Sequence, residues 1–160
     1  MNETMRGELD IDDLAGLRSF VLAGRADFTL ENQETSGRFT FKVCAPSKET
    51  EAGGLVIDHD ANVRFVKVLT GPDNGSDYTF LGTIFLGTGD FRVSGKSRIP
   101  AGAPSAKAWA WFWGRVSKNV ALPACLSVWH EGRCARCGRK LTVPESISSG
   151  YGPECRAKAA

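Results

Sequence analysis

Three cysteines near the C-terminal end constrain the fold of this chain more than any other feature. Cys134 and Cys137 are separated by two residues, and seventeen more separate Cys137 from Cys155. Thiolates at positions i and i+3 of a tight turn can reach one tetrahedral ion, which a third thiolate and one imidazole would complete. His130 lies four residues before Cys134. The spacing therefore predicts a structural Zn²⁺ site, one ion per chain, with His130, Cys134, Cys137 and Cys155 as ligands.

The fourth ligand stays open at this point. Cys125 is the alternative to His130, and a water molecule or a second chain would also complete the coordination. A closed site with four protein ligands has no free position for a substrate, so the expected role of the metal is structural. Metal binding would then supply much of the folding free energy of residues 130–156, because zinc-finger peptides gain about 10–16 kcal/mol from the metal.

The length and composition are typical of one globular domain with a small appendage. The chain has 160 residues, of which 42% are hydrophobic, and it contains five cysteines, an odd number that argues against a disulfide framework. No apolar run approaches the ~20 residues that cross a bilayer, and the acidic N-terminus does not resemble a signal peptide. We therefore expect a cytoplasmic protein with no membrane partner. The expected units are an N-terminal tail and short helix (1–25), an α+β domain (26–129) and a zinc knuckle (130–160).

Charge is distributed unevenly along the chain. Residues 1–87 contain 8 Lys and Arg against 14 Asp and Glu, whereas residues 88–140 contain 10 against 2. The basic residues of the second stretch are Arg92, Lys96, Arg98, Lys107, Arg115, Lys118, Arg133, Arg136, Arg139 and Lys140. Such a stretch indicates a polyanionic partner and carries no information on the fold.

Alternating hydrophobic residues predict an antiparallel sheet. The expected strands cover residues 28–31, 38–43, 55–57, 63–68, 78–84 and 91–93, with a last strand at 126–129. The first two form a hairpin across the polar segment 31–37, and a Gly- and Pro-containing turn at 71–77 joins two later strands. Short strands joined by short turns favour a meander-like sheet.

Two helices are expected beside this sheet. The first follows a loose tail at residues 1–9, with Asp10 or Asp12 as its cap and Gly24 as its stop. The second starts at Ser105, its expected cap, and ends near Lys118. Its apolar face consists of Trp109, Phe112, Trp113 and Val116, and its other side carries Lys107, Trp111, Arg115 and Lys118. The apolar face should cover the sheet, which gives an α+β fold packed by one main helix and followed by a small zinc knuckle.

The C-terminal motif resembles that of an uncharacterised zinc-knuckle family of bacteriophage, mobile-element and bacterial proteins, some of which carry it beside nucleic-acid-processing domains. The residues of the motif are Cys134-Ala-Arg-Cys137-Gly-Arg-Lys-Leu-Thr142, Pro144-Glu-Ser-Ile147 and Gly150-Tyr-Gly-Pro-Glu-Cys155. A longer form of the family is similar at residues 38–43, 68–74, 77–84 and 103–113. The resemblance implies the three cysteines as ligands, fits His130 less securely, and implies no activity because the family has none established. If the chain is encoded by a phage, its compartment is the cytosol of the bacterial host.

Together the metal site and the basic stretch predict binding of nucleic acid, mainly through its phosphates. Arginines on a fixed turn suit phosphate contacts, and single strands are typically held by a cationic groove with stacked aromatic side chains. The candidate contact residues are Arg92, Lys96, Arg98, Lys107, Trp111, Arg115, Arg133, Arg136, Arg139 and Lys140. The sequence does not distinguish DNA from RNA or single from double strands.

The alternative function belongs to another class. A small protein of this kind can instead bind a host protein and modulate it, with the zinc purely structural and the acidic residues 1–87 contributing to the interface. No constellation of catalytic residues is evident in the sequence. Asp58-His-Asp60 could in principle act as acid and base, but three polar residues in this context are more typical of a turn. We therefore expect no enzymatic activity.

Overall fold

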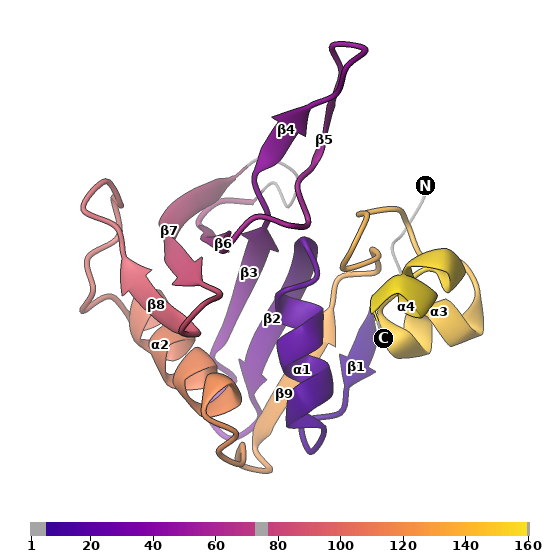
Figure 1. Ribbon diagram of the computed structural model, residues 1–160. Helices are drawn as coiled ribbons and strands as arrows, with labels where there is room; N and C mark the ends of the chain where they lie inside the picture. Colours follow the sequence, from indigo (N-terminus) through magenta and orange to yellow (C-terminus); the bar gives the residue numbers. More distant parts are fainter. Residues whose placement is uncertain (1–5, 73–76, 160) are drawn as a thin grey trace.

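The computed structural model describes residues 6–72 and 77–159 of the chain. In chain order its elements are β1 (Gly7–Leu9), α1 (Leu14–Val21), β2 (Arg25–Asn32), β3 (Arg38–Cys44), β4 (Ser47–Glu49), β5 (Leu55–Ile57), β6 (Val63–Leu69), β7 (Tyr78–Phe85), β8 (Asp90–Val93), α2 (Pro104–Ser117), β9 (Leu126–His130), α3 (Pro144–Ser149) and α4 (Pro153–Ala159). A seven-stranded antiparallel sheet with helices packed on one face forms the body of the molecule (Figure 1), which confirms the α+β class. None of the described helices is long and apolar enough to cross a membrane.

The strand order of the main sheet is β1-β9-β2-β3-β6-β7-β8. Within this sheet β2, β3, β6, β7 and β8 are neighbours in chain order, as expected for a meander. Residues 73–76 of the turn between β6 and β7 lie outside the described residues. The last strand departs from this order, because β9 pairs between β1 and β2. β1 itself lies in the segment expected to be a loose tail. This pairing places His130, at the end of β9, opposite Phe28 of β2.

The strand expected at Leu55–Ile57 forms, but it does not belong to the main sheet. It is β5, which pairs with β4 as a separate two-stranded hairpin. Figure 1 shows this hairpin extending away from the end of the main sheet. Leu55 and Val56 are 71% and 45% exposed, so the hairpin presents apolar side chains to solvent.

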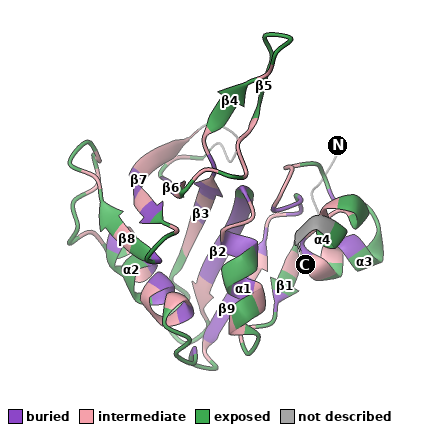
Figure 2. Cartoon of the chain, viewed as in Figure 1, coloured by how far each residue is buried: buried purple, intermediate pink, exposed green. Residues whose placement is uncertain are grey.

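The hydrophobic core lies between one face of the sheet and helices α1 and α2. Phe28 and Phe41 point to this face, and the ring of Trp109 contacts theirs at centroid distances of 6.1 and 5.2 Å. Trp113 stacks on Trp109 and donates its indole N–H to the Gly89 carbonyl at 2.8 Å. Figure 2 shows the buried residues gathered along the strands and the helix sides that meet them. The apolar helix face expected from the sequence is confirmed as buried: Trp109, Phe112, Trp113 and Val116.

Both long helices begin at residues other than those expected. The carboxylate of Asp13 caps α1, whereas Asp10 accepts a hydrogen bond from the Asp12 N–H at 2.9 Å in the preceding turn. Helix α2 begins at Pro104, so Ser105 lies inside the helix and does not cap it. Proline suits the first helical position because its fixed φ is helical and its missing N–H would have no partner there.

The opposite face of the sheet carries no helix in the part of the chain that the structure describes. In Figure 1, α1 and α2 lie in front of the sheet, and α3 and α4 lie beside its β1 edge. Because side chains alternate along each strand, the residues between the core positions point to this second face. The strand register places one row of them across the sheet, in the order Arg25, Cys44, Phe65, Thr83 and Arg92. This face therefore brings together charged and aromatic residues that are distant in sequence.

Candidate metal centre

The first two cysteines lie on a tight turn that follows β9, within the segment 131–159 that we call the knuckle. The Cys134 N–H donates to the Arg139 carbonyl, and the Gly138 N–H donates to the Cys134 carbonyl, each at 2.8 Å. Gly138 has a φ of +79°, which glycine adopts without steric cost. The chain can therefore reverse directly after the second thiol.

The third cysteine comes from helix α4. Helix α3 ends at Gly150, whose φ is +81°, and the Gly150 carbonyl accepts a hydrogen bond from the Ala135 N–H at 3.0 Å. This bond holds the end of α3 against the cysteine turn, and α4 starts shortly afterwards. The sulfurs of Cys134, Cys137 and Cys155 lie within 4.8 Å of one another. The three cysteines thus form a cluster that can hold a metal ion.

The surroundings of the cluster favour ionisation of Cys134. Burial opposes the thiolate, but the backbone N–H groups of Gly152, Cys137 and Arg136 form hydrogen bonds with its sulfur, and the net effect lowers the pKa of Cys134. Burial and hydrogen bonds with the other two thiols raise the pKa of Cys155 to about 11. The surroundings thus favour the thiolate of Cys134 over that of Cys155, and a cation held by the three sulfurs would stabilise thiolates at the site.

The donor set fits a zinc ion. A tetrahedral site with Zn–S bonds of about 2.3 Å has sulfurs roughly 3.8 Å apart, and the three thiols lie within 4.8 Å of one another. Thiolates are soft ligands that suit zinc. Among the described residues, no fourth His, Cys, Asp or Glu belongs to this cluster. A pocket of about 550 Å³ borders Cys137 and Cys155 and is also lined by Glu154.

His130, the ligand expected from its spacing, does not join the cluster. Its ring is buried at the end of β9, where Nδ1 accepts a hydrogen bond from the Gly132 N–H at 3.0 Å and Nε2 donates to the Ile147 carbonyl. Burial lowers the pKa of His130, although the bond to Ile147 and the charge of Glu131 oppose this shift. The main chain engages both nitrogens of a neutral ring. In this structure His130 connects β9 to α3 and does not act as a fourth ligand.

The two remaining cysteines also lie outside the cluster. Cys125 immediately precedes β9, so the whole strand separates it from the knuckle, and it does not replace His130. Cys44 ends β3, where burial raises its pKa against the influence of Lys67 and Lys42. Both are free thiols.

The candidate nucleic-acid-binding residues are divided between two ends of the sheet. On β8, the loop after it and α2 lie Arg92, Lys96, Arg98, Lys107, Trp111 and Arg115. On the cysteine turn lie Arg133, Arg136, Arg139 and Lys140. β8 is an edge strand, and five strand spacings, roughly 24 Å, separate it from the β9 strand that leads into the knuckle. The continuous basic stretch of the sequence is therefore not one surface.

The fold adds one basic residue that sequence reasoning missed. The N–H of Arg25, the first residue of β2, donates to the Ala135 carbonyl at 2.7 Å. The Arg25 side chain passes close to the cysteine turn, since a Cβ on Gly138 would lie 3.3 Å from its Cδ atom. Arg25 stands in the acidic half of the sequence, so no spacing or charge run indicates it. Arg25 comes close to the cysteine turn only because β2 pairs with β9, the strand that leads into this turn.

The comparisons with known proteins reach only the C-terminal part of the chain. Residues 127–160 match DUF6011, a family of unknown function. A search of curated proteins and a search of solved structures found no match. The matched segment begins in β9 and includes all three clustered cysteines. It agrees with the resemblance to an uncharacterised family with a cysteine cluster, and it assigns no activity.

Proposed function

We propose that this protein binds nucleic acid through its phosphates, beside a structural Zn²⁺ ion. The ligands of the ion are Cys134, Cys137 and Cys155. The observation that carries the proposal is the set of basic side chains on the turn that these cysteines define, which are Arg133, Arg136, Arg139 and Lys140. A turn fixed by main-chain hydrogen bonds and a metal holds arginine forks in place, and a fixed fork suits the paired oxygens of a phosphate.

The charges of this turn are available to a polyanion. Between described residues, the ion pairs are Arg6 with Glu131 and Lys48 with Asp58, and neither involves the turn. Arg133, Arg139 and Lys140 are exposed, and Arg136 is half-buried. Phosphate contacts position a protein on nucleic acid without reading its sequence. The proposed binding is therefore largely independent of sequence, and the proposed setting is the cytosol of a bacterial host, with a phage or mobile element as the source.

The salt dependence of binding tests the proposal. Affinity for labelled single- and double-stranded DNA and RNA should fall steeply with salt, with log K falling by about 0.9 per decade for each phosphate contact on a duplex. Changing Arg133, Arg136 and Arg139 together to Ala should weaken binding to every form and reduce that slope by about 2.7 if each makes one contact. No binding to any of the four forms at low salt would exclude this function.

A matched control removes the same charge elsewhere. The triple variant Lys96→Ala, Arg98→Ala and Lys107→Ala carries the same charge change beside β8, at the far edge of the sheet. It should bind duplex nearly as tightly as the unchanged protein. Equal losses in the two triple variants would show that net charge, and not the turn, determines affinity.

The alternative is a protein partner, and the β4–β5 hairpin is the observation that favours it. Leu55 and Val56 are 71% and 45% exposed there, and exposed apolar side chains are typical of protein interfaces. Pull-down from the native host distinguishes the two functions. A host protein retained at high salt, lost in a Leu55→Ser and Val56→Ser variant, together with no affinity for nucleic acid, would support this alternative with the zinc purely structural.

A further inference from the structure

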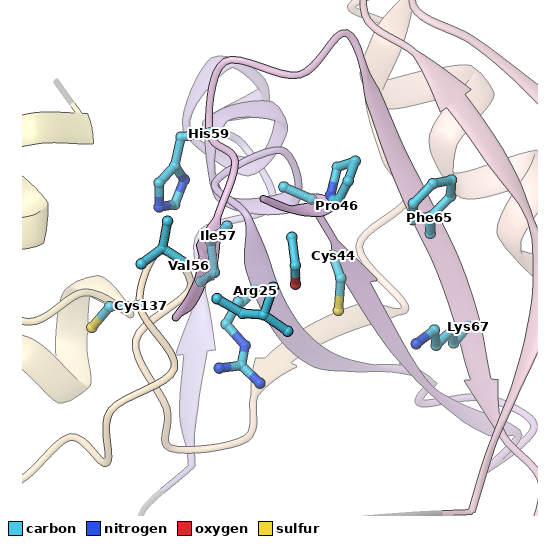
Figure 3. A pocket seen from close by; sticks show the side chains of 12 residues that line it. Arg25, Cys44, Pro46, Val56, Ile57, His59, Phe65, Lys67 and Cys137 are labelled. Carbon is cyan, nitrogen blue, oxygen red and sulfur yellow. The ribbon is translucent and has the colours of Figure 1, made fainter. Parts of the chain in front are cut away.

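A groove of about 740 Å³ lies on the helix-free face of the sheet, beside the β4–β5 hairpin (Figure 3). Its sheet side is formed by Arg25, Cys44, Phe65 and Lys67, from β2, β3 and β6. Residues of the hairpin, among them Val56, form the facing wall. Cys137 also lines this sheet-face groove, so the groove reaches the metal cluster and its basic turn.

The sheet-face groove is cationic and partly apolar. In Figure 3 the side chains of Arg25 and Lys67 lie on either side of the Cys44 thiol. No Asp or Glu is among the described residues that line the groove. Cys44 adds no negative charge at neutral pH, because burial raises the pKa of its thiol. Two cations beside apolar side chains suit an anion that also carries flat, apolar groups.

The same face continues toward β8 with aromatic and basic side chains. The rings of Phe65 and Phe80 meet edge to face at 6.1 Å. Phe85 is 40% exposed, and the Arg92 guanidinium lies over its ring at 5.7 Å. The row from Arg25 to Arg92 crosses four strand spacings, roughly 19 Å. This row runs from Arg25, beside the basic turn of the knuckle, to Arg92 on β8.

Acidic residues of the same face are neutralised or lie outside the groove. Glu131 accepts a hydrogen bond from the Arg6 guanidinium at 2.8 Å and forms an ion pair with it. Asp27 is buried, and its carboxyl accepts a hydrogen bond from the Tyr78 hydroxyl at 3.1 Å. Glu131 follows β9, and Asp27 lies two residues after Arg25 on β2, opposite Lys42. Neither lines the groove, so an anion in the groove does not meet an unpaired carboxylate.

We infer that the sheet-face groove binds single-stranded nucleic acid, with phosphates on Arg25 and Lys67 and an unstacked base against Phe65. The inference rests on the proposed function and specifies the form of nucleic acid. Proteins that hold single strands combine a cationic groove with aromatic rings on which bases stack, and the bases of a duplex are not free to do so. The strand leaves the groove at Arg25, beside the basic turn of the knuckle.

The exposed side of α2 carries a basic stripe with one aromatic ring: Lys107, Trp111, Arg115 and Lys118. This stripe is less suited to stacking with a base. Trp111 is 40% exposed, but the Arg115 guanidinium lies over its ring at 5.2 Å. Arg115 also donates to the Ala121 carbonyl at 2.6 Å, which holds it there. Helix α2 packs on the other face of the sheet, so this stripe is not part of the sheet-face groove. Helix α2 thus supplies matched control positions.

Fluorescence anisotropy with the full chain tests the inference, using labelled oligo-dT and oligo-rU of about fifteen nucleotides and a DNA duplex as probes. In about 0.1 M salt, the double variant Arg25→Gln and Lys67→Gln should bind the single strands roughly twentyfold more weakly, since each phosphate contact changes the salt slope by about 0.7. Phe65→Leu should weaken them about fivefold to tenfold through the lost stack. Neither change should alter duplex affinity by more than about twofold.

The controls are Lys107→Gln with Lys118→Gln, and Trp111→Leu, which remove two positive charges and one aromatic ring on α2 and at its C-cap. Circular dichroism melts and zinc content confirm that every variant is folded. The inference is overturned if the groove variants bind single strands as tightly as the α2 controls do. If in that case the knuckle triple variant still weakens binding, the proposed function stands without the inference. An equal loss for single strands and duplex would also overturn it. A stronger loss with dT or with rU identifies the preferred strand and supports the inference.

Discussion

The sheet and the knuckle reach a fixed structure by different means. The sheet buries large rings, such as Phe28, Trp109 and Trp113, each no more than 2% exposed. In the knuckle, the buried hydrophobic residues among the described side chains are Cys134, Ala135 and Leu141. So little apolar area cannot offset the conformational entropy of ordering such a segment. The sheet is therefore expected to fold without a metal, whereas the knuckle depends on one.

A few contacts of the main chain and of two rings join the two regions. The Arg25 N–H donates to the Ala135 carbonyl, and the buried ring of His130 bridges Gly132 and Ile147. The Tyr151 ring also packs edge to face on Phe20 of the core, at a centroid distance of 5.9 Å. These contacts position the knuckle against the sheet and bury far less apolar surface than the core of the sheet does. Loss of the metal should therefore release the knuckle and leave the sheet intact.

The largest expected effect comes from removing metal ligands. The double variant Cys134→Ala and Cys155→Ala should lose the ion and with it on the order of 10 kcal/mol of metal-dependent folding free energy. Elemental analysis should find about one zinc per chain in the unchanged protein and none in the variant. Hydrogen exchange should rise throughout the knuckle, while β2, β3, β6 and β7 of the main sheet stay protected.

Cys125→Ala is the matched control for this variant, because it removes a thiol outside the cluster. It should keep the full zinc content. Retention of full zinc by the double variant would refute the ligand set. Unfolding of the sheet together with the knuckle would instead show that the two regions are one cooperative unit.

The second largest expected effect is on the stability of the sheet. Trp109→Ala should lower the free energy of unfolding by about 3–5 kcal/mol, because the indole packs against Phe28, Phe41 and Trp113 in a fully buried site. Urea unfolding measures this loss. Trp111→Ala, on the exposed side of the same helix, should change stability by less than about 1 kcal/mol. Loss of zinc in folded Trp109→Ala protein would contradict the independence of the two regions.

Local patterns in the sequence were sufficient for most of the sheet. Alternating residues identified β2, β3, β6, β7 and β8, and a spacing of three and four residues identified the buried face of α2, because both patterns reflect which side chains face a core. The position of β9 could not be found in this way. Its insertion between β1 and β2 depends on pairing across most of the chain, and no local pattern records such pairing.

The residues of the candidate site were likewise predictable in part. The spacing of Cys134, Cys137 and Cys155 was informative because a turn and a short helix place their sulfurs together. His130 has suitable spacing, but the sheet register directs its ring into a buried position where the main chain satisfies both nitrogens. Arg25 reaches the cysteine turn only through the fold. Ligands within one short C-terminal segment are therefore predictable from sequence, whereas contacts made across the sheet are not.

His130→Ala separates a ligand from a connecting residue. As a ligand, His130 would be needed for metal binding, and the variant would lose zinc. As the bridge seen here, it leaves the zinc content at about one per chain, and its loss costs roughly 1–3 kcal/mol because two buried main-chain groups lose their partners. Elemental analysis and urea unfolding of the same sample distinguish these outcomes. A zinc-free, folded variant would restore His130 as the fourth ligand.

The smallest expected effect is a response to pH that differs in sign between the two regions. In the knuckle, acid weakens metal binding because protons compete for the thiolates. In the sheet, burial raises the pKa of Asp27, although Lys42 and the Tyr78 hydroxyl oppose the shift. The folded state therefore holds this proton more tightly than the unfolded chain, and this contribution to stability increases as the pH falls from the raised folded pKa toward about 3.9.

Asp27→Asn isolates that contribution, because an amide oxygen can still accept the hydrogen bond from Tyr78 but does not titrate. At neutral pH the variant should be more stable than the unchanged protein by about 1 kcal/mol or less, since the buried carboxylate charge is removed. The knuckle is the same in both proteins, so its acid sensitivity cancels from the difference between them. Urea unfolding at several pH values should show this difference shrinking toward about pH 4. If the stability of the variant relative to the unchanged protein instead increased with acid, ionised Asp27 would stabilise the sheet. Acid would then weaken both the sheet and the knuckle.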